Sequence, residues 1–321
     1  MRRLVLISPA AATCRGHFDE LAGVEVVERY DLAETPDTSR LAAGLAGAWA
    51  VVAGGEPYDR TTLAAADDLR AIVRWGTGSD AIDVGAATAR EVAVVTMPGA
   101  NSEAVADLAL TLMLGCLRRL PELEAAARGR DWRPPSPAGD LAEATVGIVG
   151  LGAIGRAVAR RLRGFGCRVL AVEPAPDIDF CRHYEVEPAS LADMLSQVDA
   201  VTLHTPLSPS THHIIGAPEL ARLPRHAVVI NTARGQLIDQ PALVRALAEG
   251  AIAGAGLDVF EREPLPENDP LRTLPNVIVT GHAASFTRLG MGRTGEAVLA
   301  ALRSMLHGRL PDGCLNPETW G

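Results

Sequence analysis

Residues 146–155 read VGIVGLGAIG, an apolar run that passes directly into a glycine-rich turn. The pattern predicts a strand, a tight turn and then a helix through residues 156–165. The first glycine of the turn permits the sharp reversal, the second lets a dinucleotide pyrophosphate approach backbone amides at the helix N-terminus, and the third allows helix and strand to pack closely. The cofactor-binding residues predicted in this turn are Gly150, Gly152, Ala153, Ile154 and Gly155.

The strand expected after this helix, at residues 168–172, is followed directly by Glu173. An acidic side chain about 20 residues after such a turn receives the ribose hydroxyls of NAD. Its charge repels the additional phosphate of NADP. Residues 174–176 are Pro, Ala and Pro, so no adjacent arginine is present to bind that phosphate. The sequence therefore predicts NAD as the cofactor and Glu173 as one of its ligands.

Short β-branched runs alternate with Ala- and Leu-rich amphipathic stretches along most of the chain. This alternation predicts an α/β fold with doubly wound parallel sheets, because parallel strands need crossover helices on their faces. A chain of 321 residues with 48% hydrophobic content favours two domains. The strands expected in the first sheet are 4–7, 24–27, 49–52, 71–74 and 93–96. Those expected in the second, six-stranded sheet are 145–149, 168–172, 200–203, 227–231, 252–257 and 277–280.

The composition excludes several classes of function. A formal net charge of -9 argues against nucleic acid as a partner. The apolar runs are too short or too interrupted to span a bilayer, so no membrane partner is expected. The five cysteines are scattered without Cys-x-x-Cys spacing, which argues against a disulfide framework and against a metal site. Such cysteine usage fits a cytoplasmic location.

Three polar side chains, Arg234, Glu263 and His282, follow later expected strands, at the sheet edge where open parallel sheets bind ligands. Reduction of a 2-oxo acid requires a cation that holds the carboxylate and polarises the carbonyl, which suits Arg234. It also requires a proton donor, which suits His282, with Glu263 as the carboxylate that stabilises the imidazolium. Taken singly, these residues are better explained as one half of a surface ion pair, a solvated loop acid and a helix-start residue. Their position together beside the nucleotide turn favours a catalytic site.

Asp258 follows the expected strand at residues 252–257. Its carboxylate either orients the nicotinamide carboxamide or caps the turn that comes next. The sequence leaves both roles open.

Five segments resemble the D-isomer-specific 2-hydroxyacid dehydrogenases, and the likeness covers almost the whole chain. These segments are residues 150–155, 203–207, 231–235, 256–260 and 275–282. The resemblance implies a Rossmann nucleotide domain at residues 99–287 and a flavodoxin-like substrate domain made of residues 1–98 and 288–321. It implies hydride transfer between NAD and a small 2-oxo or 2-hydroxy acid, acting on the D-isomer, with the catalytic roles given above. It also implies a homodimer.

The resemblance implies further binding residues. Those expected at the cofactor are His204, Thr205, Pro206, Thr211, Thr232, Ala233 and Asp258. Residues 74–83 resemble the family's glycine loop, whose amides at Thr77 and Gly78 are expected to meet the substrate carboxylate together with Arg234. Without the resemblance, this segment is an ordinary turn after a strand.

Some positions depart from the family's pattern and bear on the substrate. Gly281 stands where proline usually precedes the histidine, and Phe286 replaces a residue that is often small, so both are expected to reshape the pocket wall. Residues 53–55 are Ala, Gly and Gly, where phosphoglycerate-type members often carry arginine and serine. This difference argues against a phosphorylated substrate. Reduction of glyoxylate or hydroxypyruvate is therefore the expected reaction.

Two other functions stay open on the sequence alone. NADH-sensing corepressors resemble these enzymes and use cofactor binding to control assembly. Phosphite oxidation runs on a similar scaffold with a basic residue near the glycine loop, where this chain has Arg74.

Overall fold

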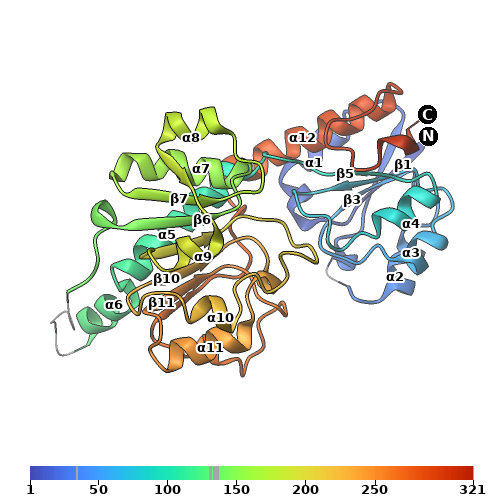
Figure 1. Cartoon of the computed structure of the whole chain (residues 1–321). Helices are drawn as coiled ribbons and strands as arrows, with labels where there is room; N and C mark the ends of the chain where they lie inside the picture. Colours follow the sequence, from blue (N-terminus) through green and yellow to red (C-terminus); the bar gives the residue numbers. More distant parts are fainter. Residues whose placement is uncertain (34, 130–131, 133–136, 321) are drawn as a thin grey trace. The chain divides into compact units, whose positions relative to one another are not determined.

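The computed structural model describes residues 1–33, 35–129, 132 and 137–320, and the chain divides into two compact units (Figure 1). The first unit comprises Met1–Asn101 and Phe286–Gly321, and the second comprises Ser102–Ser285. The sequence prediction set the boundaries at 98/99 and 287/288. Each unit contains its own parallel sheet with helices on its faces, so the predicted α/β class with two doubly wound sheets is confirmed.

The sheet of the first unit has five parallel strands in the order β2-β1-β3-β4-β5, which is the flavodoxin-like order. One face packs against short helices α2, α3 and α4, and the other packs against α1 and the long helix α12. The strands are β1 (Arg2–Leu6), β2 (Val24–Glu28), β3 (Ala50–Ala53), β4 (Ala71–Arg74) and β5 (Ala93–Val95). The helices are α1 (Arg15–Phe18), α2 (Thr38–Gly44), α3 (Arg60–Ala64), α4 (Val84–Ala89) and α12 (Arg288–Leu306).

The sheet of the second unit has seven parallel strands in the order β12-β11-β10-β9-β6-β7-β8. The strands are β6 (Thr145–Val149), β7 (Arg168–Val172), β8 (Val186–Pro188), β9 (Ala200–Leu203), β10 (Val228–Asn231), β11 (Gly254–Leu257) and β12 (Val277–Val279). The prediction of six strands was wrong, because it omitted β8. This strand is only three residues long, ends in proline and pairs with β7 alone at the sheet edge, so it shows no hydrophobic alternation.

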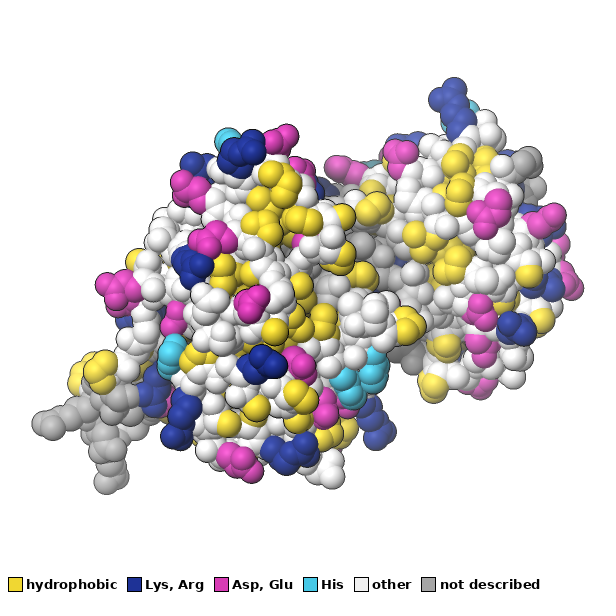
Figure 2. Space-filling view, in the orientation of Figure 1, with side chains coloured by type: hydrophobic (Ala, Val, Ile, Leu, Met, Phe, Trp, Pro, Cys, Tyr) yellow, Lys and Arg dark blue, Asp and Glu magenta, His cyan; other side chains and the backbone are white. Residues whose placement is uncertain are grey.

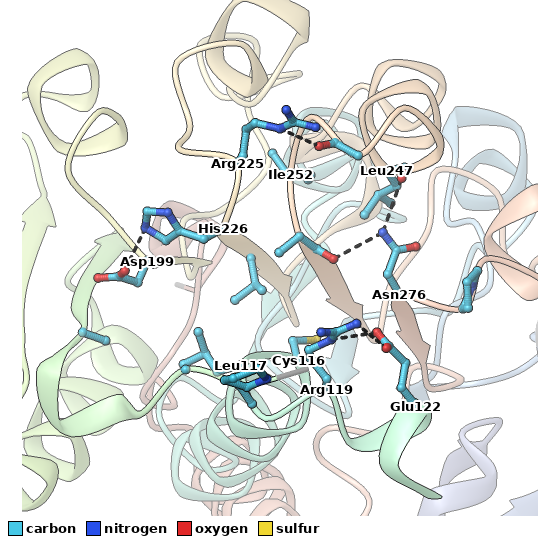
Figure 3. Close-up of a pocket in the computed structure, with 18 of the residues that line it drawn as sticks. Cys116, Leu117, Arg119, Glu122, Asp199, Arg225, His226, Leu247, Ile252 and Asn276 are labelled. Atoms are coloured by element: carbon cyan, nitrogen blue, oxygen red, sulfur yellow. Dashed lines mark hydrogen bonds and ion pairs between the residues drawn. The ribbon is translucent and has the colours of Figure 1, made fainter. Parts of the chain in front are cut away.

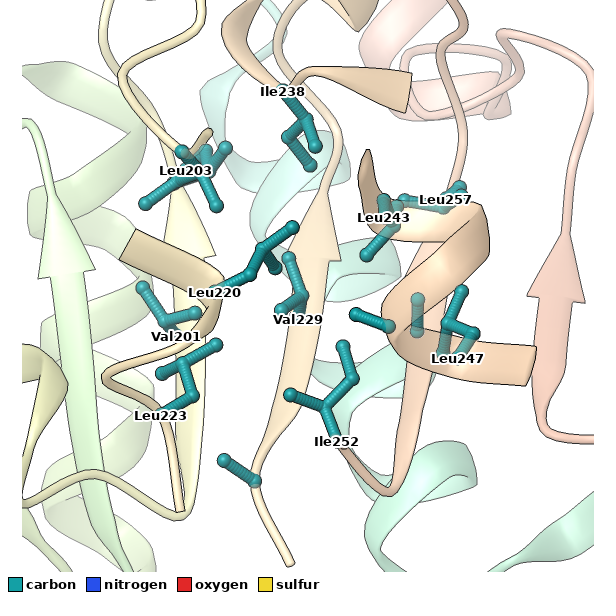
Figure 4. Close-up of a cluster of buried hydrophobic side chains, with 14 of the residues drawn as sticks. Val201, Leu203, Leu220, Leu223, Val229, Ile238, Leu243, Leu247, Ile252 and Leu257 are labelled. Atoms are coloured by element: carbon teal, nitrogen blue, oxygen red, sulfur yellow. The ribbon is translucent and has the colours of Figure 1, made fainter. Parts of the chain in front are cut away.

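Helices cover both faces of the second sheet. Helices α5 (Ser102–Leu117), α7 (Ala153–Leu162) and α8 (Ile178–Tyr184) pack on one face, and α6 (Leu120–Arg128) follows α5. Helices α9 (Leu191–Leu195), α10 (Ala217–Leu220) and α11 (Gln240–Ala248) pack on the other face. Figure 4 shows the second of these cores, where side chains of β9 and β10 meet Leu220, Leu243 and Leu247. Burial on both faces explains the almost continuous apolar runs of the central strands.

The order of the strands reverses between β6 and β9, which lie side by side while their crossover helices pack on opposite faces. Open parallel sheets bind ligands at the carboxyl ends of the strands that flank such a reversal. Most of the candidate cofactor residues follow β6, β9 and β10, while Glu173 follows β7 and Asp258 follows β11. They therefore share the edge formed by the carboxyl ends of these strands.

The surface carries charges of both signs. Figure 2 shows basic and acidic side chains interspersed over both units on the face that it draws. This mixture differs from the basic stripe typical of proteins that bind nucleic acid. In the part of the chain that the structure describes, no helix is both long and apolar enough to cross a membrane. All five cysteines are free thiols.

Candidate active site

The glycine turn after β6 combines close packing at two of its glycines with open space at the remaining one. Gly150 has a φ of +93°, and a Cβ there would lie 2.7 Å from Thr205 N. A Cβ on Gly155 would overlap Gly150 O, so this glycine sets the close approach of α7 to the turn. By contrast, a Cβ on Gly152 would meet no described atom within 4 Å, and Gly152 caps α7 without a side-chain hydrogen bond. Open space at a helix N-terminus with unsatisfied amides suits a phosphate group.

Glu173 follows β7 directly and bends back to the glycine turn. Its Oε2 accepts a hydrogen bond from Leu151 N at 2.9 Å. The carboxylate therefore lies beside the glycine turn, and its contact with the ribose stays a prediction.

Two residues that directly follow β9 and β10, at the same edge of the sheet, each bury a polar side-chain atom. His204 donates or accepts through Nε2 with Thr202 Oγ1 at 2.9 Å, while its Nδ1 and Thr232 Oγ1 find no hydrogen-bond partner among the described residues. Burial lowers the pKa of His204 to about 3, so its ring is neutral at physiological pH. A buried polar atom without a partner costs about 1–3 kcal/mol, and a bound ligand can remove this cost. The residues at this edge therefore fit a dinucleotide.

The loop after β9 carries three further cofactor candidates, Thr205, Pro206 and Thr211. Thr211 Oγ1 donates to Pro206 O at 2.7 Å and accepts from Ser208 N at 2.8 Å. Its hydroxyl therefore stabilises the conformation of this loop through two hydrogen bonds within it. Thr205 contributes its backbone, which packs against Gly150.

Arg234 lies in the loop after β10, next to Ala233, and its Nη1 donates to Ala233 O at 2.7 Å. The buried side chain of Asn231 holds this loop, since its Nδ2 donates to Arg234 O at 2.8 Å and its Oδ1 accepts from Ala233 N at 3.0 Å. Gly235 packs so closely on Phe260 that a Cβ there would overlap its backbone. The sequence prediction gave no role to Asn231, although an asparagine between a strand and a turn is a recognised signal for such contacts.

His282 and Glu263 are joined by a hydrogen bond of 2.6 Å between Nδ1 and Oε2. The other oxygen, Oε1, accepts from Phe260 N at 3.0 Å, which fixes the carboxylate. Burial raises the pKa of Glu263, but the hydrogen bond and charge of His282, the Phe260 amide and the charge of Arg234 outweigh burial and lower it overall. The charge of Arg234 makes the smallest of these contributions.

Asp258 holds the turn that presents His282. Its buried carboxylate accepts from Thr280 Oγ1 at 2.6 Å, Ala283 N at 2.8 Å and Ala284 N at 2.9 Å. Its carbonyl accepts from His282 N at 2.7 Å, and His282 has a φ of +53°. The geometry favours the second of the two roles left open by the sequence, because both carboxylate oxygens already accept hydrogen bonds within the turn.

Thr77 and Gly78 lie in the first unit, in the loop after β4, whereas the other candidate residues lie in the second unit. Gly76 precedes them with a φ of +132°, a conformation that favours glycine. Thr77 Oγ1 lies 3.4 Å from both Met97 O and Asn101 Oδ1.

The second unit has a cavity of about 1050 Å³ that is separate from these residues (Figure 3). Its lining includes Ala144, Asp199, Val228 and Asn276, which begin or immediately precede strands of the sheet. The cavity therefore lies at the amino ends of the strands, whereas the glycine turn lies at their carboxyl ends. None of the candidate site residues lines it.

Comparison with known proteins decides the family. The sequence profile described as "D-isomer specific 2-hydroxyacid dehydrogenase, NAD binding domain" matches residues 110–284, more than half of the chain. The chain belongs to this family. The match includes the glycine turn, Arg234, Glu263 and His282. As a D-2-hydroxyacid dehydrogenase, the protein is an oxidoreductase that uses NAD and acts on CH–OH donors.

Individual relatives extend the likeness beyond the nucleotide domain. The dehydrogenase is 41% identical over 268 residues to a glyoxylate reductase of Korarchaeum cryptofilum, which covers 82% of this chain and 81% of the relative. It is 38% identical to a D-3-phosphoglycerate dehydrogenase of Methanocaldococcus jannaschii, but spans only 51% of that protein. The crystal structure of a glyoxylate reductase from Paecilomyes thermophila superimposes with a TM-score of 0.86 at 32% identity, covering 99% of both chains.

Proposed function

We propose that this dehydrogenase reduces a small, unphosphorylated 2-oxo acid with NADH, glyoxylate or hydroxypyruvate first, and forms the D-isomer where the product is chiral. The observation that carries the proposal is the 2.6 Å hydrogen bond between His282 and Glu263. Together with Arg234, which lies in the same unit, these side chains form the candidate catalytic cluster. This cluster combines a titratable proton donor, a carboxylate that stabilises its charged form and a guanidinium that can bind a carboxylate. A 2-oxo acid presents the matching groups.

The hydrogen bonds already present in the site indicate which atom can transfer a proton to the substrate. His282 Nδ1 is held by Glu263, so a proton passes to the substrate from Nε2. The Arg234 guanidinium holds the substrate carboxylate and polarises the adjacent carbonyl. When bound, the nicotinamide supplies the hydride. The substrate carbonyl carbon would take this hydride and its oxygen would take the proton of His282 Nε2, which leaves His282 as neutral imidazole. Glu263 stabilises the imidazolium before that proton leaves.

The cofactor contacts belong to the same proposal. The open space at Gly152 and the amides of Ala153 and Ile154 support pyrophosphate binding. Glu173 supports ribose binding, and the unsatisfied atoms of His204 and Thr232 support further polar contacts. Asp258 is proposed as a residue that positions His282.

The surroundings of Gly54 support an unphosphorylated substrate. The side chain of Glu56 is fully buried beside it, and Oε1 accepts from Gly54 N at 2.8 Å and from Tyr58 Oη at 2.7 Å. A phosphate group requires cationic or amide donors. A carboxyl group at this position, without an arginine in residues 53–55, disfavours one.

The direct test is NADH consumption with glyoxylate, hydroxypyruvate, pyruvate, phenylpyruvate, 2-oxoglutarate and 3-phosphohydroxypyruvate. We expect the highest kcat/KM with glyoxylate or hydroxypyruvate, and chiral chromatography of the hydroxypyruvate product should give the D-isomer. Preference for 3-phosphohydroxypyruvate would overturn the substrate class. NADH binding without turnover on any of these acids would favour an NADH-sensing protein instead. Turnover of phosphite would favour the phosphite-type reaction.

We also propose that the protein is a homodimer and acts in the cytoplasm. The family resemblance supports the dimer, and five free cysteines suit a reducing compartment. Light scattering of the purified protein would test the first point, and a monomer mass of 33.7 kDa would contradict it.

A further inference from the structure

A basic side chain lies beside the glycine turn and has no part in the proposed contacts with NAD. Arg156 follows the third glycine of the turn, and its Nε donates to Leu151 O at 3.0 Å. The backbone N of the same Leu151 donates to Glu173 Oε2 at 2.9 Å. The guanidinium of Arg156 and the carboxylate of Glu173 are therefore anchored to the two polar atoms of one residue of the turn.

Asp177 supplies the negative charge that engages this guanidinium. Its Oδ2 lies 3.0 Å from Arg156 Nη1. Its Oδ1 accepts from Phe180 N at 3.1 Å and caps α8. The Phe180 amide, followed by the charge of Arg156, lowers the pKa of Asp177, so the carboxylate is charged at neutral pH. Arg156 also lies over the ring of Phe180, at 4.9 Å from its centroid, and these contacts together set the direction of its guanidinium.

The charge balance around Glu173 bears on the choice between NAD and NADP. The two cofactors differ by one phosphate on the adenosine ribose, the sugar that Glu173 is proposed to bind. Binding this phosphate requires a cation, and the sequence offers none immediately after Glu173, at residues 174–176. The fold does bring a cation, Arg156, to the turn from α7, but it is paired with Asp177.

We propose that Asp177 determines cofactor specificity by withholding the Arg156 guanidinium from a ribose 2′-phosphate. Selectivity for NAD then depends on two carboxylates: Glu173 repels the phosphate, and Asp177 neutralises the cation that would bind it. The pair is partly exposed, with side-chain exposures of 36% and 42%, so it is weak enough for Arg156 to change partner once Asp177 loses its charge. This inference rests on the proposed ribose site at Glu173.

The test uses the full chain carrying Glu173→Gln, a change that removes the first repulsion at nearly constant size. Asp177→Asn is added in one variant, because asparagine still caps α8 but carries no charge. Asp179→Asn is added in a matched control, since Asp179 lies in the same helix, is 92% exposed and pairs with Arg182 rather than Arg156. The dissociation constants of NADPH and NADH are measured by fluorescence titration without substrate.

We expect Asp177→Asn to tighten NADPH binding by about tenfold relative to Glu173→Gln alone, as a new charge-assisted contact would. Asp179→Asn should change it by less than about twofold, and NADH binding should stay within about twofold for both added changes. Adding Arg156→Gln to the Glu173→Gln, Asp177→Asn variant should abolish the gain. Equal gains from Asp177→Asn and Asp179→Asn, or a gain that survives Arg156→Gln, would overturn the proposal.

Three further comparisons test the proposal when a single variant folds poorly or the ribose site itself is wrong. Asp177→Ser also preserves a helix cap and removes the charge. It must therefore reproduce the gain in NADPH affinity, so the test does not depend on how well the asparagine variant folds. Glu173→Gln alone tests the ribose site, because unchanged affinities for both cofactors would refute that site while leaving the contribution of Asp177 to be read from the added substitutions. The gain should also shrink as salt rises, since it depends on charge.

Discussion

Among the carboxyl groups of the candidate site, Glu263 has a pKa that its surroundings clearly lower. Its pKa lies below the usual 4.5, because the His282 hydrogen bond and charge outweigh burial. We predict that ¹³C NMR titration of the Glu263 carboxyl carbon gives a value under 4.5 in the wild-type protein and a higher value in His282→Ala. An identical value in the two proteins would mean that His282 does not act on this carboxyl group.

The same shift has a consequence for stability. A depressed carboxyl pKa stabilises the folded state above the unfolded-state value and loses this effect as pH falls through the folded-state value. We therefore expect the unfolding free energy of the wild-type protein to fall more steeply below about pH 4.5 than that of Glu263→Gln. Urea unfolding of both proteins from pH 7 down to pH 3.5 measures this difference, and parallel curves would contradict it.

At the scale of single residues, the sequence indicated which residues belong to the candidate site but said less about the contacts that they make. Arg234, Glu263 and His282 could be singled out because each follows a strand of a parallel sheet. The contact of Asn231 with two backbone atoms could not be predicted, since it depends on the path of the loop. The two roles of Asp258 could be separated only once Thr280, Ala283 and Ala284 were seen to donate to its carboxylate.

Two glycines of the turn between β6 and α7 provide a matched pair of tests at the scale of elements. Gly155→Ala forces α7 away from Gly150 O, and overpacking of this kind costs about 1–3 kcal/mol of unfolding free energy. Gly152→Ala meets open space and has a φ of -73°, so it should change stability by less than about 0.5 kcal/mol. It should nevertheless weaken NADH binding by at least about tenfold, because its methyl group occupies the proposed pyrophosphate space.

Urea unfolding and NADH titration of both alanine variants separate the two effects. If Gly152→Ala bound NADH as tightly as the wild-type protein, the pyrophosphate would not approach this glycine.

The turn from Thr280 to Ala284 is the second element whose role can be tested. In Asp258→Asn, one of the three donors faces an NH₂ group instead of an oxygen, and leaving a buried donor unsatisfied costs about 1–3 kcal/mol. We expect that loss in urea unfolding together with a fall in kcat, because His282 is then held less firmly. A large rise in the NADH dissociation constant with unchanged kcat and stability would instead support contact with the nicotinamide.

Strands were predictable where burial gives them length and β-branched residues. Each of the expected strands is present, with ends that shift by two residues at most. Strand β8 was missed because its three residues at the sheet edge, of which only Val186 is buried, carry no such signal.

At the scale of the whole molecule, cofactor binding should appear as a gain in stability. A ligand at about 100 times its dissociation constant stabilises the folded state by about 2.7 kcal/mol. We predict that NADH raises the melting temperature and that NADPH at the same concentration raises it less, since Glu173 is proposed to repel the ribose 2′-phosphate and Asp177 to withhold the Arg156 guanidinium from it. Differential scanning calorimetry measures both shifts, and equal shifts would contradict the predicted selectivity for NAD.

The organisation of the chain into two sheets was predictable because alternation of strand and helix signals persists along its length. The structure divides the chain at 101/102 and 285/286, close to the start of α5 and shortly before α12. The sequence prediction placed these boundaries at 98/99 and 287/288. A residue in a connecting segment is assigned to one unit or the other by the contacts that it makes. Residue types alone do not reveal these contacts.

The central claim is that His282 donates the proton in NADH-dependent reduction of a small 2-oxo acid. The most direct test is single-turnover reduction of glyoxylate and hydroxypyruvate by wild-type protein and His282→Ala, with the NADH dissociation constant measured for both. We predict that the variant binds NADH within about twofold of wild type but oxidises it at least about a hundredfold more slowly, as expected for loss of a general acid. Equal rates of NADH oxidation in the two proteins would contradict the account.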